Sequence, residues 1–198
     1  MKMKNDYIQT KCFGHVVITD DETNEVLLDD YNALHPENLS QALCLSLANR
    51  GFGHLNQMVF GNGASTISGT GSVTYFPPNA IGADAQLYNQ TYFKVIDDQS
   101  PSNVDPTRNF IEVVHTQGMA YTDIITTCVL ERGEPSGQDS FDNSENMDTA
   151  FIFDEIGLKS FDQNTAQQRL LGHIVFNPVQ KSLNRALRFK YTFRIYLT

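Results

Sequence analysis

The chain has 198 residues, of which 40% are hydrophobic and 11% aromatic, and this is enough to bury the core of one domain. Its 14 Lys and Arg residues against 23 Asp and Glu residues give a net charge of -9. This charge argues against general nucleic-acid binding because no basic surplus is left to displace phosphate counterions. No stretch reaches the roughly 18 apolar residues of a membrane span, and the opening residues lack the apolar segment of a signal peptide, so we expect neither membrane insertion nor secretion.

The first predicted elements are a hairpin and a helix. Short apolar runs at 15–19 and 25–28 flank a polar turn, which is typical of two antiparallel strands. Pro36 then favours the start of a helix. Three leucines at helical spacing follow before two glycines end the pattern: Leu39, Leu43 and Leu47. The spacing predicts one helix over about residues 37–50.

The rest of the chain has the composition of β-structure. Seven further segments are rich in Val, Ile, Thr, Phe and Tyr and are bounded by turn residues. The predicted strands are 54–60, 87–96, 110–115, 121–130, 150–158, 170–176 and 186–197. Residues 64–86 and 133–148 are polar or Gly-rich and predict long loops. We therefore expect a mostly β protein, an antiparallel β-sandwich of about nine strands with one α-helix, as a single domain over 1–198.

The last predicted strand carries the strongest pattern in the chain. From 187 to 197 apolar residues alternate with residues that are mostly basic or polar. At about 3.3 Å per residue this strand spans roughly 36 Å, longer than a usual strand. Its basic face must meet either water or an acidic partner.

Charge is unevenly distributed along the chain. The C-terminal region is basic, whereas the stretches 12–49 and 133–148 carry acidic residues and no Lys or Arg. These charges are either solvated or complementary between neighbouring copies, where they would set register and orientation. The candidate interface residues are Arg185, Arg188, Lys190, Arg194, Asp20, Asp21, Glu22, Asp139 and Asp142.

No motif predicts a catalytic, cofactor or metal site. The Gly-rich segments at 61–63 and 69–71 fit neither the dinucleotide-binding fingerprint nor the phosphate-binding loop, and the five histidines lack metal-ligand spacing. Cys12, Cys44 and Cys128 form no CxxC pair, so neither a disulfide framework nor a zinc knuckle is expected. We expect a protein that is not an enzyme and that needs no cofactor.

Three groups of motifs resemble a family of virion structural proteins from tailed bacteriophages, notably phages of cyanobacteria. The first group is GHVVI at 14–18 with NEVLL at 24–28, NALHPENL at 32–39 and FGNG at 60–63; the second is GEPSGQ at 133–138; the third runs from FDEIGL at 153–158 to HIVFNPVQKS at 173–182 and the closing strand. The resemblance implies a component of the tail, neck or baseplate. It also implies synthesis in the host cytoplasm, location in the virion and no known cofactor.

Three functions are compatible with these observations. The first is a homo-oligomeric ring or adaptor that contacts other tail, neck or baseplate proteins, the basic C-terminal strand of one copy meeting an acidic segment of the next. The second is a receptor- or glycan-binding module of a tail fibre that uses Tyr75, Phe76, Tyr88 and Tyr92. A capsid decoration protein is a further structural alternative. The third is a virion-associated hydrolase that uses loop carboxylates such as Asp139 and Asp142.

Overall fold

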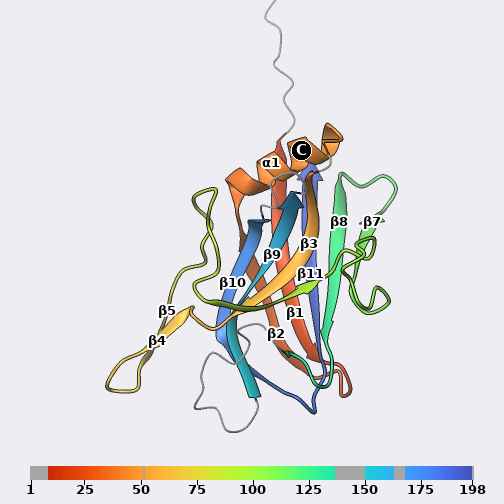
Figure 1. The fold of residues 1–198 in the computed structure, drawn as a ribbon. Coiled ribbons are helices and arrows are strands. Elements are labelled where there is room, and N and C mark those ends of the chain that lie inside the picture. The colour runs from red at the N-terminus through yellow and green to blue at the C-terminus, as the bar shows by residue number, and fades with distance from the viewer. Residues whose placement is uncertain (1–8, 51, 137–149, 163–167, 198) are drawn as a thin grey trace, which may run out of the picture.

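The computed structural model describes residues 9–50, 52–136, 150–162 and 168–197. In this part of the chain there are eleven strands and one helix (Figure 1). Their bounds are β1 Thr10–Asp20, β2 Val26–Leu34, α1 Pro36–Leu47, β3 Phe52–Gly61, β4 Ser65–Ile67, β5 Val73–Tyr75, β6 Gln90–Val95, β7 Phe110–His115, β8 Tyr121–Leu130, β9 Ala150–Asp162, β10 Gln168–Ser182 and β11 Leu187–Leu197.

Nine of these strands form one antiparallel sheet that curls into two facing layers. The strand order is β6-β3-β9-β10-β2-β1-β11-β8-β7. We call β2, β1, β11, β8 and β7 layer A, and β10, β9, β3 and β6 layer B. Among the described strands, the layers are joined by strand pairing only between β2 and β10, at Gly172 with Leu34 and His173 with Ala33. The expectation of a mostly β, sandwich-like fold with one helix is confirmed.

An aromatic core fills the space between the layers. Phe60 on β3 lies with its ring centroid 5.0 Å from that of Phe189 on β11, and Phe153 on β9 lies 5.6 Å from the same ring. These contacts join strands that are far apart in the sheet order. Edge-to-face and tilted pairs of this kind contribute roughly 0.5–1.5 kcal/mol each beyond the burial of their area. The core therefore closes the curled sheet into a sandwich.

Helix α1 covers one end of the sandwich (Figure 1). The side chain of His35 caps the helix, its Nδ1 accepting a hydrogen bond from the backbone N–H of Asn38 at 3.2 Å. The helix packs through Leu39 and Ala42, which are buried. Leu47 is 88% exposed, so the apolar face predicted from the leucine spacing is only partly used.

The predicted elements differ from the observed ones mainly in length. Strands β7, β8 and β11 match the predicted bounds closely, whereas β1 and β2 extend well beyond 15–19 and 25–28. β10 is longer than the predicted strand 170–176: it continues past Pro178 to Ser182, and the register against β9 shifts between Val175 and Val179. A bulge at this point accommodates a residue that cannot donate to the ladder.

The predicted loop over 64–86 contains a short hairpin. Strands β4 and β5 pair only with each other, Ile67 opposite Val73. The hairpin projects from the body of the sandwich (Figure 1), and we call residues 65–75 the arm. The other predicted loop, 133–148, lies largely outside the described residues.

We expect Gly53→Ala to destabilise the fold. Gly53 has φ of +97°, and a Cβ there would lie 2.6 Å from the backbone oxygen of Ala42 in α1. The backbone strain and the clash with the helix predict a loss of about 2 kcal/mol or more in the free energy of unfolding. Urea denaturation measures this loss. Gly69→Ala is the matched control, since a Cβ at Gly69 meets nothing within 4 Å; an equal loss in both variants would contradict the role assigned to Gly53.

Candidate interaction surfaces

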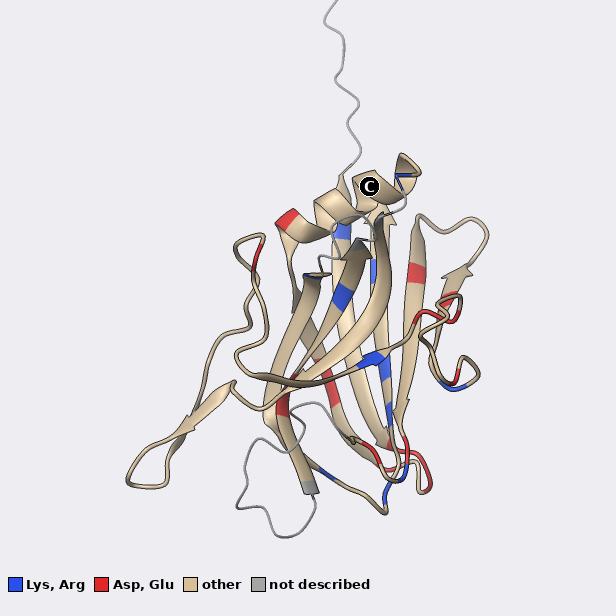
Figure 2. Cartoon of the chain, viewed as in Figure 1, with Lys and Arg blue, Asp and Glu red and all other residues tan. Residues whose placement is uncertain are grey.

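The basic side chains of the C-terminal region are paired within the chain. Arg185 Nε lies 2.5 Å from Asp20 Oδ2, and Arg188 Nε lies 2.7 Å from Asp21 Oδ1. Figure 2 shows the acidic and basic segments side by side at the end of the sandwich away from α1. Asp20 is the last residue of β1 and Asp21 follows it. Because β1 and β11 are antiparallel neighbours, Asp20 lies opposite Leu187, close to Arg185 and Arg188.

Arg194 forms a bidentate pair on the outer face of layer A. Its Nε and Nη2 donate to the two carboxylate oxygens of Asp123 at 2.6 and 2.7 Å, a bidentate arrangement. The hydrogen bond from Arg194 holds the pKa of Asp123 below its usual value, although burial opposes the shift. The same bond raises the pKa of Arg194.

Asp21 is shared between two cations. Besides Arg188 it accepts a hydrogen bond from Arg108 at 2.8 Å, and Arg108 also donates to Glu131 at 2.7 Å. Burial acts to raise the pKa of Asp21, but the bonds from the two guanidinium groups outweigh it and the pKa is lowered. This network ties the turn after β1 to β11 and to the segment after β8.

These pairings change the expected role of the candidate interface residues. Arg185 pairs with Asp20, Arg188 with Asp21 and Arg194 with Asp123 inside one chain, so these charges are compensated without a second copy. That they join neighbouring copies stays a prediction. Glu22 also pairs within the chain, with Arg132 at 2.6 Å. Lys190 is exposed and takes part in none of the ion pairs between described residues. Asp139 and Asp142 lie outside the described residues.

The closing strand is not an open edge. β11 pairs along its length with β1 on one side and β8 on the other. Its backbone hydrogen-bonding groups are therefore used within the chain. The ends of the curled sheet are β6 and β7 instead.

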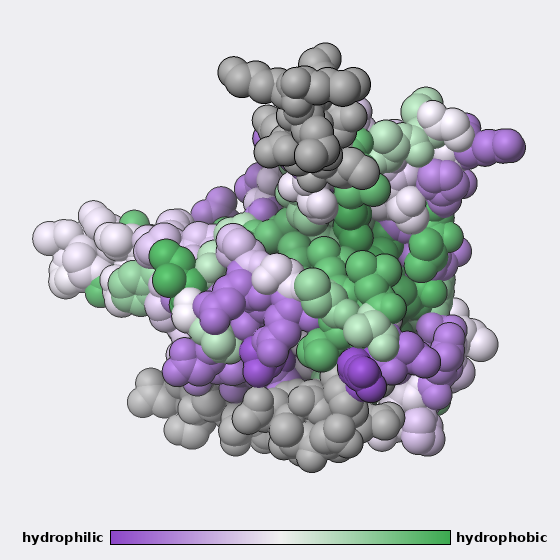
Figure 3. All heavy atoms as spheres, turned by 90° about the horizontal axis from the view of Figure 1, so that it is seen from above, coloured by the Kyte–Doolittle hydropathy of each residue, from purple (hydrophilic) through white to green (hydrophobic). Residues whose placement is uncertain are grey.

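A cavity of about 1140 Å³ opens at the α1 end of the sandwich. Its apolar wall includes Leu34, Leu43, Leu55, Ile124 and Phe193, from the helix and from both layers. Figure 3 looks down on this end and shows hydrophobic atoms gathered across the middle of it.

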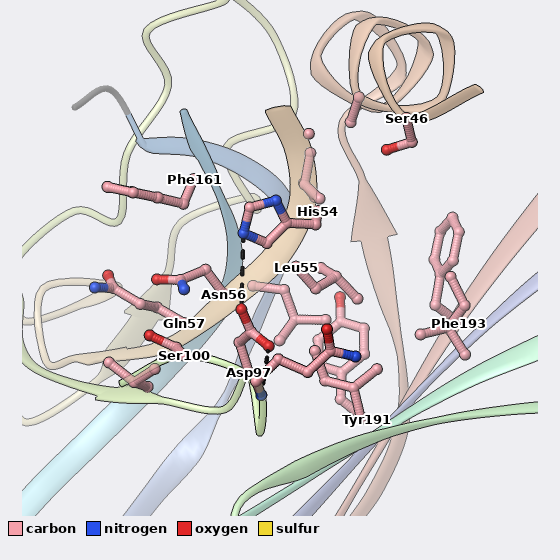
Figure 4. A pocket seen from close by; sticks show the side chains of 18 of the residues that line it. Ser46, His54, Leu55, Asn56, Gln57, Asp97, Ser100, Phe161, Tyr191 and Phe193 are labelled. Atoms are coloured by element: carbon pink, nitrogen blue, oxygen red, sulfur yellow. Dashed lines mark hydrogen bonds and ion pairs between the residues drawn. The ribbon is translucent and has the colours of Figure 1, made fainter. Parts of the chain in front are cut away.

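Polar groups lie beside the start of β3 in the same cavity. Figure 4 shows Asn56, Gln57 and Ser100 on one side of this strand and Tyr191 and Phe193 on the other. His54 Nε2 lies 3.7 Å from Asp97 Oδ2, and Gln57 Oε1 is buried and accepts no hydrogen bond from the described residues. The His54–Asp97 distance exceeds the roughly 2.6–3.2 Å of the hydrogen bonds that orient a catalytic base. This distance therefore does not identify His54 as a general base.

The arm is held at its base and free at its tip. Asp154 accepts hydrogen bonds from Ser65 Oγ at 2.6 Å and from the backbone N–H of Ala64 at 3.2 Å. Burial raises the pKa of Asp154. Beyond these contacts Ile67 is 73% exposed and Val73 45% exposed. No charged side chain occurs from 55 to 83, and Figure 2 shows an arm without red or blue segments.

A buried carboxylate fixes the segment that follows the arm. Glu155 accepts hydrogen bonds from the backbone N–H groups of Tyr88 at 2.9 Å and Asn89 at 2.8 Å, and lies 3.0 Å from His173 Nε2. The backbone N–H of Asn79 donates to His173 Nδ1, which leaves Nε2 as the donor to Glu155. Burial acts to raise the pKa of Glu155, but these bonds outweigh it and the pKa is lowered.

The aromatic residues proposed for glycan binding do not all lie at the surface. Tyr92 is buried in the core against Phe60. The ring of Tyr88 contacts Phe76 and His173, and Tyr75 donates to Asn177. Their side chains serve packing and loop attachment.

Another set of aromatic side chains does form an open groove, on the outer face of layer A. Strand pairing aligns His15 with Tyr31, Phe13 with Arg194, and Tyr196 with Tyr121. The lining residues of this aromatic groove are Lys11, Phe13, His15, Tyr31, Tyr121, Thr192, Arg194 and Tyr196, and its volume is about 570 Å³. Of these residues only Arg194 is among the candidates predicted from the sequence. Alternation marks the outward residues of each strand, but the register between strands is not visible in the sequence.

No protein-family model matches the chain, and neither a curated protein nor a solved structure matches it. Among the described residues no three His, Cys, Asp or Glu side chains are grouped so that they could hold a metal ion. None of the helical residues in the described ranges forms a segment long and apolar enough to cross a membrane.

The ion pairs predict that charge reversal destabilises the chain itself. In Arg188→Glu combined with Arg194→Glu, two acidic side chains face the largely buried Asp21 and Asp123. We expect a loss of about 2 kcal/mol in the free energy of unfolding, measured by urea denaturation. Lys190→Glu, an exposed change on the same strand, is the control and should stay within about 0.5 kcal/mol of the wild type. A double variant as stable as the wild type would refute the intrachain pairing.

Proposed function

We propose that the chain is a non-enzymatic structural protein of a tailed-phage virion. It assembles with further copies of itself into a ring or adaptor of the tail, neck or baseplate, where it also meets other proteins of that region. The family-like motifs in the sequence support the class of protein. The observation that supports self-assembly is the arm.

The arm has the properties of a segment that is completed by a partner. A two-stranded hairpin is marginally stable alone in water, and both outer edges of the β4–β5 pair carry backbone groups that no described strand takes up. Its exposed Ile67 and Val73 add apolar surface without any charge to keep it solvated. Pairing with a strand of another chain would both satisfy these backbone groups and cover the apolar side chains.

The second copy offers a suitable edge in β7. This strand ends the curled sheet, so one of its edges is unpaired within the described chain. Val113 is 70% exposed and Val114 is also exposed. When the arm of one copy pairs with β7 of the next, the contact joins two different surfaces of the same protein and is therefore heterologous. Such contacts close into a ring when the rotation between copies permits it.

The copy number in the particle tests the structural class. Quantitative mass spectrometry of purified virions, referred to the portal protein, should find about six or twelve copies per particle if the chain forms a cyclic ring. Hundreds of copies would instead indicate a capsid decoration protein. Absence from the particle would overturn the proposal.

Removing the apolar surface of the arm tests the assembly contact. We expect Ile67→Asp to abolish the oligomer, because an unpaired carboxylate would be buried in the contact, while the melting temperature stays close to that of the wild type. Light scattering after size-exclusion chromatography and native mass spectrometry measure the oligomer. Leu47→Asp introduces the same charge at an equally exposed site on α1 and should assemble normally. Assembly by Ile67→Asp, or a wild-type chain that stays monomeric, would contradict the role of the arm.

A further inference from the structure

We propose that the aromatic groove on layer A binds a neutral oligosaccharide. This inference does not depend on the arm or on self-assembly. It rests on the kind of side chain that lines the groove, on the way its charges are paired, and on its size and shape.

The groove presents aromatic rings and no aliphatic side chains. Tyr31 is 73% exposed and Phe13 is 50% exposed, which is unusual for large aromatic residues on adjacent strands. Leu, Ile, Val and Met are all missing from its lining, although they are common elsewhere on this surface. Protein interfaces are also enriched in Tyr, Phe and Arg, but their buried core is more apolar than the rest of the surface, and this groove has no Leu, Ile, Val or Met to form such a core. A sugar ring instead needs a flat aromatic face for its C–H groups and polar atoms at its edges.

Two of the basic side chains that line the groove, Arg194 and His15, are paired within the chain, whereas Lys11 takes part in none of the ion pairs between described residues. Arg194 is held by both oxygens of Asp123, and His15 Nε2 lies 2.6 Å from Asp29 Oδ1. The guanidinium also stacks over the ring of Tyr121, 4.0 Å from its centroid. A phosphate or nucleic-acid ligand requires cations that are free to pair with it. These pairs and the net charge of -9 favour an uncharged ligand.

Polar atoms for hydrogen bonding surround the rings. The hydroxyl groups of Tyr31, Tyr121, Tyr196 and Thr192 can each donate and accept. Such groups match the hydroxyls at the edge of a sugar. Tyrosine supplies a stacking face and a polar tip in one side chain with little loss of conformational entropy.

The groove has the dimensions of a site for a chain of sugars. Its volume of about 570 Å³ lies within the range of small-molecule sites. It crosses four neighbouring strands from Tyr31 on β2 to Tyr121 on β8. Three strand spacings of about 4.8 Å give roughly 14 Å, more than a single sugar ring needs.

Affinity electrophoresis tests the proposal. The purified chain is run in native gels that contain a soluble neutral polysaccharide, with dextran, galactomannan and hydroxyethyl cellulose as probes, and is applied in parallel to an array of neutral and acidic oligosaccharides. We expect retardation by at least one neutral probe. Tyr31→Ala should weaken binding by about tenfold because it removes the most exposed stacking face, while Tyr31→Phe should retain most of it.

Controls separate the groove from the rest of the surface. Lys190→Ala removes an exposed side chain from the same face of β11 as Thr192 but outside the groove, and should bind like the wild type. Melting curves should show that all three variants remain folded. The proposal is overturned by the absence of binding to every neutral saccharide, by tighter binding to acidic saccharides or single-stranded DNA, or by loss of the oligomer in Tyr31→Ala.

Discussion

The arrangement of the two layers depends on the contact between three strands, β10, β2 and β11. Gly172 on β10 pairs with the end of β2, and a Cβ on this glycine would overlap the hydroxyl of Tyr191 from β11. That buried hydroxyl is hydrogen-bonded to Asn32 Nδ2 on β2. Because the backbone link between layers spans only two residue pairs, side chains must fix the angle between them. The aromatic core then holds this angle along the rest of the sandwich, and the α1 end stays wide enough to enclose a cavity.

Local patterns were sufficient to predict the elements that obey a simple period. Strand β11 alternates cleanly, β7 and β8 are rich in residues that favour strands, and α1 has both a proline start and leucine spacing. The hairpin in the arm could not be predicted in this way, since its strands are three residues long and lie among Gly, Ser and Thr. The length of β10 was underestimated because Pro178 suggests the end of a strand, whereas a bulge lets the strand continue.

The partners of the charged residues required the tertiary structure. Arg185 and Asp20 are separated by almost the whole chain, and only the pairing of β1 with β11 brings them together. Sequence alone identified the uneven distribution of charge but could not distinguish pairing within a chain from pairing between chains. The aromatic groove was missed for the same reason: Phe13, Tyr31 and Tyr121 are scattered in sequence and become neighbours through strand register.

The arm contains no Asp, Glu, Lys or Arg, and this bears on how the proposed assembly would respond to salt. Contacts between exposed ions weaken as salt is added, because the Debye length falls from about 30 Å at 0.01 M to about 8 Å at 0.15 M. The arm contains no ionisable side chain of this kind, and the charged pairs lie inside single subunits. If such arms join the copies, the contact should depend less on salt concentration than a contact between exposed ions would, while the ion pairs stabilise each copy separately.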